Sequence, residues 1–178
     1  MSKPRPAEAV KLLMSTIYAD DDIAKNLLEI LSEHYGSTDF ISTRMPFQYT
    51  DYYTGEMGSR LVRRVVFFDK LIRPESLPDV KLFTNNVEDM FAVTGKRRVN
   101  VDPGYMSQAH LILATGKGYT HRPYLRDGIY ADLTLIYRGK SFHSLPWTYP
   151  DYAEKLTIEM FNRIRSKYLM QLKSSLNI

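Results

Sequence analysis

The chain has 178 residues, of which 44% are hydrophobic and 25% are charged, as in an ordinary globular domain. Its 24 Lys and Arg against 20 Asp and Glu leave a small positive excess, so we do not expect a nucleic-acid partner. The absence of cysteine excludes disulfides, thiolate metal sites and a cysteine nucleophile.

The sequence also contains no segment that predicts export or membrane insertion. The longest apolar run is about five residues, against the ~20 that a membrane helix needs. The N-terminal residues include basic side chains, but no apolar stretch of a signal peptide follows them. We therefore expect a cytoplasmic protein with no membrane contact.

The first hundred residues predict alternating strands and helices. In chain order these are a strand at 10–19, a helix at 21–35, strands at 39–47 and 59–68, a helix from Pro78 to before Gly95, and a strand at 97–101. The first helix is predicted from a possible cap at Asp20 and from Ile23, Leu27 and Leu31 at helical spacing. This order is that of a ferredoxin-like βαββαβ core, an α+β sheet with both helices on one face.

The remaining residues are predicted to extend that core. Residues 107–115 suggest a short helix, and residues 151–172 a long terminal helix. Between them, Asp127-Gly128 separates two strand-like runs at 122–126 and 129–137, which is a strong signal for a β-hairpin. We expect one domain over residues 1–178, with the core at about 8–102 and a C-terminal extension at about 103–178.

Asp102 is a candidate site residue because it follows the predicted strand at 97–101. Polar groups at strand ends can emerge from a rigid sheet into a crevice. The alternative is that Asp102-Pro103-Gly104 is a turn, in which Pro fixes one φ angle and Gly supplies a positive one. The turn is the favoured interpretation, and it does not exclude a functional role.

The predicted hairpin brings a second pair of polar side chains together. Counted outward from the turn, Arg126 pairs with Ile129, Pro123 with Asp132, and His121 with Thr134. His121 and Asp132 then share one face of the hairpin, and Arg122 points to the other unless the strand twists or ends before it. A carboxylate beside an imidazole can prepare a general base, and the same pair can supply two metal ligands. The alternative is a surface or interface pair with no chemistry.

Arg97, Arg98 and Tyr105 are candidates for contacts to an anion and a ring. Basic residues cluster at Lys96-Arg97-Arg98, and with neighbouring tyrosines they could hold a phosphate or stack on a base. A solvated strand face is the favoured alternative. Gly116-Lys117-Gly118 lacks the spacing of a P-loop, and no dinucleotide-binding, zinc-protease or serine-hydrolase motif is present.

The chain resembles, over nearly its whole length, an uncharacterised bacterial family known as domain of unknown function 4416. The resemblance rests on several blocks in order, among them Thr50-Asp51-Tyr52-Tyr53, Arg98-Val99-Asn100-Val101-Asp102-Pro103-Gly104-Tyr105, Asp127-Gly128-Ile129-Tyr130-Ala131 and Pro146-Trp147-Thr148-Tyr149-Pro150-Asp151-Tyr152. It implies bacterial origin and a cytoplasmic location, and it assigns no activity.

Two hypotheses on function follow. In the first, the domain binds a small phosphorylated or nucleotide-like molecule, either as a binding protein or as an enzyme. Asp102, His121 and Asp132 would be its acid, base or metal groups, with a divalent metal as a candidate cofactor. In the second, it is an RNA-binding or protein-interaction module without catalysis, although no RRM signature is present.

Overall fold

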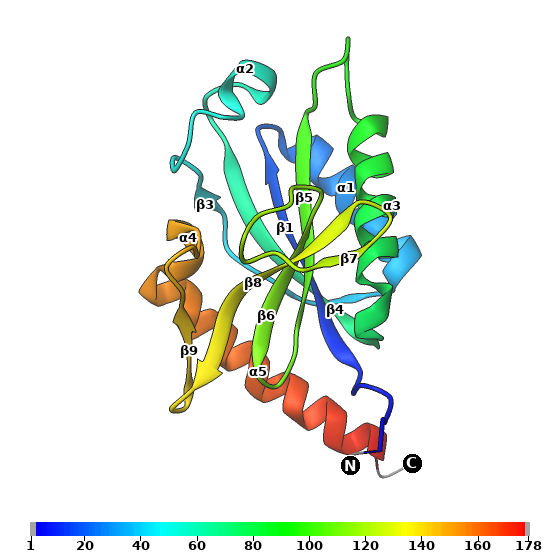
Figure 1. Cartoon of the computed structure of the whole chain (residues 1–178). Coiled ribbons are helices and arrows are strands. Elements are labelled where there is room, and N and C mark those ends of the chain that lie inside the picture. The colour runs from blue at the N-terminus through cyan, green and yellow to red at the C-terminus, as the bar shows by residue number, and fades with distance from the viewer. Residues whose placement is uncertain (1–2, 177–178) are drawn as a thin grey trace.

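The computed structural model describes residues 3–176, and within them the chain forms a single antiparallel sheet of nine strands with helices on both faces (Figure 1). Seven strands lie in the order β2-β4-β1-β5-β6-β8-β7, while β3 pairs with β4 and β9 with β8. The α+β class predicted from the sequence is confirmed.

The strands are β1 (Val10–Tyr18), β2 (Thr38–Ile41), β3 (Met45–Pro46), β4 (Val62–Ile72), β5 (Val99–Met106), β6 (His110–Thr115), β7 (Tyr124–Arg126), β8 (Ile129–Arg138) and β9 (Ser141–Ser144). The helices are α1 (Asp21–Tyr35), α2 (Thr54–Met57), α3 (Leu77–Met90), α4 (Pro150–Ala153) and α5 (Lys155–Leu176), with a 3₁₀ turn, η1 (Pro74–Ser76), before α3. No helix in the described part of the chain is long and apolar enough to cross a membrane.

Strand β1 is buried along its whole length because helices cover both of its faces. Leu12 and Met14 face one side and pack against α1 and α3 through residues such as Leu27 and Val87. Asp20 caps α1, since its carboxylate accepts from two amides of the first turn. The prediction that β1 is central and that both of these helices share one face is confirmed (Figure 1).

The opposite face of the sheet is covered by α5. Leu13 of β1 and Phe67 of β4 are fully buried there, against Phe161 and Ile164 of α5. Tyr168 fastens the same helix, because its hydroxyl donates to the Ala9 carbonyl at 2.7 Å. The terminal helix predicted at 151–172 is divided in two at Glu154, whose backbone is extended.

Two predictions around β5 are wrong. The strand does not end before Asp102 but continues to Met106, so Asp102-Pro103-Gly104 is not a turn. Residues 107–115 are not a helix, because His110–Thr115 form β6 and pair with β5 and β8. Gly104 explains the close pairing, since a Cβ there would lie 2.3 Å from the Ile112 carbonyl oxygen.

The strands after β5 continue the same sheet, in the order β6-β8-β7. The hairpin at Asp127-Gly128 is confirmed, and positive φ angles at both residues (52° and 77°) fit the turn. Its predicted register holds only for Arg126 and Ile129. An irregularity in β7 then shifts the pairing by one residue, so that Tyr124 pairs with Tyr130 and the predicted pairing of Pro123 with Asp132 is lost.

Candidate functional site

The sheet opens between β5 and β6, and this opening determines where the candidate site lies. Strand β6 pairs only with Gly104, Tyr105 and Met106 of β5. Further along, Val101 turns its amide and carbonyl away from β1, toward the side where β6 has separated. There its N–H donates to the Glu88 carboxylate at 2.7 Å, and its carbonyl accepts from Lys81 Nζ at 3.0 Å. Two side chains of α3 thus satisfy the backbone groups that a strand would otherwise pair.

The same arrangement explains how a proline is accommodated inside a central strand. Pro103 lies two residues beyond Val101, so its nitrogen also faces the side of the opening. The β5–β6 pairing begins only at Gly104. The missing N–H of Pro103 therefore costs no hydrogen bond to β1.

A cavity of about 760 Å³ occupies the opening and the face of the sheet beside it. No residue in the described part of α5 lines this cavity. Its walls come from β1, the residues around α2, α3, β5, the end of β6, β8 and α4. Its charged and tyrosine lining residues are Lys81, Glu88, Arg97, Asp102, Lys117, Arg122, Asp132, Asp151, Tyr49, Tyr52, Tyr53, Tyr149 and Tyr152. The volume is that of a small-molecule site.

Asp102 projects into this cavity from the middle of β5, on the face opposite α1 and α3. It is paired in register with Ser15 of β1. Asn100, two residues earlier and thus on the same face, donates to Asp102 Oδ2 at 2.8 Å, and Lys81 Nζ lies 3.6 Å from Oδ1. The Asp102 side chain remains 37% exposed, so its carboxylate is held in place and still accessible.

Arg97 lies at the start of β5 and joins two acidic residues to this group. Its Nε donates to Glu56 at 2.8 Å, which ties the α2 segment to β5. Its Nη1 donates to Asn100 at 3.2 Å and lies 3.6 Å from Glu88. Burial raises the pKa of Glu88 above its ordinary value, although Lys81 and Arg97 act in the opposite direction.

Asp132 faces Asp102 across the cavity from β8. Arg122 Nε donates to its Oδ2 at 2.8 Å, and His121 Nε2 lies 3.7 Å from its Oδ1, beyond hydrogen-bond distance. The His121 ring stacks on Trp147 with ring centroids 4.8 Å apart. The prediction that His121 and Asp132 lie together is confirmed. Arg122 does not point away from Asp132, which is the exception that the prediction allowed for a strand that ends before it. Strand β7 begins only at Tyr124, so strand alternation does not extend to Arg122.

Lys117 is the least engaged cation of the cavity. Its Nζ lies 4.8 Å from the ring centroid of Tyr52, and within residues 3–176 no carboxylate lies within 4.0 Å of it. Its carbonyl accepts from Arg122 Nη1 at 3.2 Å, and Arg122 Nη2 donates to Tyr149 at 3.0 Å. Lys117 and Arg122 are thereby fixed as neighbours.

A buried arginine lies beneath the cavity. Arg63, on β4, donates to Ser15 at 2.8 Å and to Asp151 of α4 at 2.5 Å, and its guanidinium stacks 4.1 Å from the Tyr152 ring centroid. Burial raises the pKa of Asp151 and raises that of Tyr152 to about 12. Arg63 Nη2 is buried without a hydrogen-bond partner among the described residues.

The structure brings together some of the predicted site residues and separates others. Asp102, Asp132 and Arg97 line the cavity, and His121 lies behind Asp132. Arg98 instead pairs with Asp20 at 3.3 Å. Tyr105 packs with Leu77, Ala114 and Ile129 on the helix face, because it lies three positions after Asp102 in the same strand and an odd offset reverses the face. Across residues 3–176 there is no group of three or more acidic or histidine side chains that could hold a metal ion.

Lys81, Glu88, Lys117, Tyr149 and Asp151 were not predicted as site residues. Lys81 and Glu88 are seven residues apart and therefore lie on one helix face. Among apolar neighbours such as Val80 and Val87, that spacing is a sequence signal for a polar strip within a buried face. The other three gave no such signal, since only tertiary structure brings their loops to the cavity.

Comparison with known proteins identifies the family and no activity. No curated protein and no solved structure matches the chain. A family described as Domain of unknown function (DUF4416) matches residues 8–168, which include every element from β1 to most of α5 and all the cavity residues named above. The chain is a member of the DUF4416 family.

Proposed function

We propose that the cavity between β5 and β6 binds a small phosphorylated molecule with a planar ring, such as a nucleotide. The observation that carries this proposal is the position of Lys117, a cation without a carboxylate partner in the described chain, beside Arg122 and among tyrosines. Small ligands usually bind in cavities of this volume into which a few polar side chains project.

The charges of the lining direct an anion to one end of the cavity. Three of its cations are already close to carboxylates: Lys81 to Asp102, Arg97 to Glu88, and Arg122 to Asp132. Lys117 has only the Tyr52 ring. A phosphate at Lys117 would gain a charged hydrogen bond without displacing an existing ion pair, and Arg122 is near enough to contribute a second.

Tyrosines near Lys117 provide surfaces for a ring. Tyr49, Tyr52 and Tyr149 line the cavity and are each about half exposed. An exposed aromatic face stabilises a stacked base by about 1–3 kcal/mol. With a phosphate at Lys117 and a ring against these tyrosines, Asp102 is the accessible carboxylate left to accept from a hydroxyl or amino group, and it is the best candidate for a general base.

The other predicted residues take supporting roles in this proposal. Asp132 would orient Arg122, and His121 would hold Asp132 in place through its packing against Trp147. Arg97 would fix Asn100 and thereby Asp102. Arg98 and Tyr105 lie outside the cavity lining and are not part of the proposal.

We further propose that the first four long strands and their two helices are a variant of the ferredoxin-like fold. Support comes from the order β2-β4-β1-β5, the antiparallel pairing throughout and the position of α1 and α3 on one face. RNA recognition by such a sheet needs an open face. Here α5 covers the face opposite α1 and α3, which argues against the RNA-binding alternative. A cytoplasmic location remains a prediction.

Thermal stabilisation by a ligand panel tests the proposal. Purine and pyrimidine nucleoside monophosphates, the matching nucleosides, ribose 5-phosphate and inorganic phosphate would each be added to the wild-type protein. We expect at least one monophosphate to raise the melting temperature, and Lys117→Ala to remove that increase. Lys173→Ala, an exposed lysine near the end of α5, is the matched control. The proposal fails if no phosphorylated compound stabilises the protein or if Lys117→Ala responds as the wild type does.

A further inference from the structure

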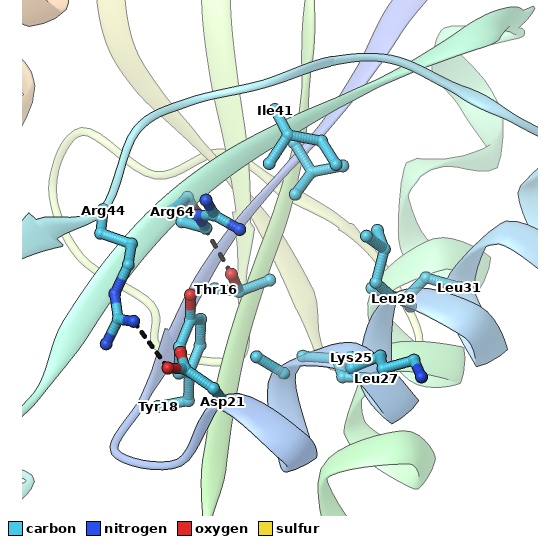
Figure 2. A pocket seen from close by; sticks show the side chains of 12 residues that line it. Thr16, Tyr18, Asp21, Lys25, Leu27, Leu28, Leu31, Ile41, Arg44 and Arg64 are labelled. Atoms are coloured by element: carbon cyan, nitrogen blue, oxygen red, sulfur yellow. Dashed lines mark hydrogen bonds and ion pairs between the residues drawn. The ribbon is translucent and has the colours of Figure 1, made fainter.

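A second cavity, of about 380 Å³, lies on the other face of the sheet, between α1 and strands β1 and β4. Most of its wall is aliphatic. The side chains are those of Ala24, Leu27, Leu28 and Leu31 from α1, with Ile41 and Val66 from the strands. Figure 2 shows these leucines on one side of the cavity and the polar side chains of Tyr18, Arg44 and Arg64 on the other.

The polar end of this cavity holds a half-buried arginine with one unpaired donor. Arg64 extends from β4 between Thr16 and Ile41 (Figure 2), and its Nε is buried without a hydrogen-bond partner among the described residues. A buried donor without an acceptor is costly, and more so when it is charged. Arg44 is tied to Asp21 at 2.6 Å, and both side chains are more than half exposed at the rim.

Tyr18 lines the same end of the cavity as Arg64 (Figure 2). Burial raises the pKa of Tyr18, and the positive charge of Arg64 opposes that rise. The cavity thus joins an apolar wall to a cationic end, which is the complement of a short amphipathic anion.

We propose that this cavity binds an aliphatic carboxylate of medium chain length. Its chain would lie against Leu27, Leu28 and Leu31, and its carboxylate would accept from Arg64. Since a water molecule takes about 30 Å³ in the liquid, the cavity has the volume of roughly a dozen heavy atoms. This proposal is independent of the nucleotide site, because the two cavities share no lining residue among those the structure describes.

Calorimetric titration with octanoate, decanoate and decanol tests it. We expect saturable binding of one carboxylate per chain, with decanoate about tenfold tighter than octanoate because each buried methylene adds to affinity. Decanol has the same chain without the charge, and we expect it to bind about tenfold more weakly than decanoate. Equal affinity for decanoate and decanol would overturn the assignment of Arg64.

Two variants test the Arg64 charge and the cavity volume separately. Arg64→Gln should weaken decanoate binding about tenfold or more. Ala24→Leu should fill the cavity and abolish binding while it keeps the helix, since leucine is a good helix former. Arg138→Gln, an exposed arginine on β8, is the matched control and should bind as the wild type does. If decanoate does not bind, or binds Ala24→Leu unchanged, the proposal is wrong, whatever the behaviour of Arg64→Gln.

Discussion

Val101 lies in the part of β5 that β6 does not reach, and its amide is supported by a carboxyl group of α3. Glu88 is buried, accepts from the Val101 amide at 2.7 Å and has a raised pKa because of that burial. The folded protein therefore holds the Glu88 proton more tightly than the unfolded chain does. By linkage, this group makes stability fall as the pH rises from about 4.5, the ordinary glutamate value, through the raised pKa.

Glu88→Gln should remove this pH dependence. A glutamine can still accept from the Val101 amide, so the strand keeps its support. Relative to the wild type, the variant should gain stability as the pH rises above about 4.5, and urea unfolding at a series of pH values would measure the gain. Glu29→Gln, on the exposed side of α1, is the control. A stability difference that stays constant across the series would contradict the role given to Glu88 burial.

His121 is a packing residue in this account. Its side chain is 9% exposed and stacks on Trp147, whose indole donates to the Leu133 carbonyl at 2.8 Å. His121→Ala should therefore lower the free energy of unfolding by about 1–3 kcal/mol through lost packing. His110→Ala, on an exposed position of β6, should change it by less than about 0.5 kcal/mol. Denaturant unfolding of both variants distinguishes them, and equal stabilities would contradict the packing role.

At the scale of elements, the sequence correctly predicted the features that depend on neighbouring residues alone. Asp20 as a cap, the apolar run of β1 and the Asp127-Gly128 turn all lie where they were expected. The errors concern β5 and β6. Asp102-Pro103-Gly104 has the composition of a turn, and its extended conformation depends on Lys81 and Glu88, which are distant in sequence.

The candidate site was predictable to a similar extent. Asp102 and Asp132 both line one cavity, although Asp102 does so from the middle of a strand and not from its predicted end. Arg122 contacts Asp132 because β7 is shorter than the alternating pattern implied. Lys117 was not predicted, because the sequence around it lacks the spacing of a P-loop. Its partner Tyr52 lies 65 positions earlier, and only the fold brings the two together.

Gly104 is the position where β5 and β6 approach most closely, and it tests the account of the opening. Gly104→Ala places a Cβ 2.3 Å from a backbone carbonyl, which cannot move aside as a flexible side chain would. We expect a loss of about 2 kcal/mol or more in the free energy of unfolding. Gly116→Ala, whose Cβ would meet nothing within 4 Å, is the matched control. Urea unfolding that ranks the two variants equally would contradict the close approach.

In the whole molecule, helices cover parts of both faces of the sheet. Polar side chains from distant segments meet at the opening between β5 and β6. Residues from β1 to α4 border that cavity, so its lining forms only when the entire sheet has folded. Strands β1 and β5 and the later strands β6 and β8 thereby contribute to one site. The central claim is that Lys117 receives the phosphate of the ligand.

The measurement that tests this claim most directly is a calorimetric cycle with one nucleoside, its monophosphate, the wild-type protein and Lys117→Ala. In the wild type, the monophosphate should bind about tenfold or more tightly than the nucleoside because of a charge-assisted hydrogen bond. In Lys117→Ala that preference should disappear, while the nucleoside binds as before. A wild-type protein that binds both compounds equally, or a variant that keeps the full preference for the monophosphate, would contradict the account.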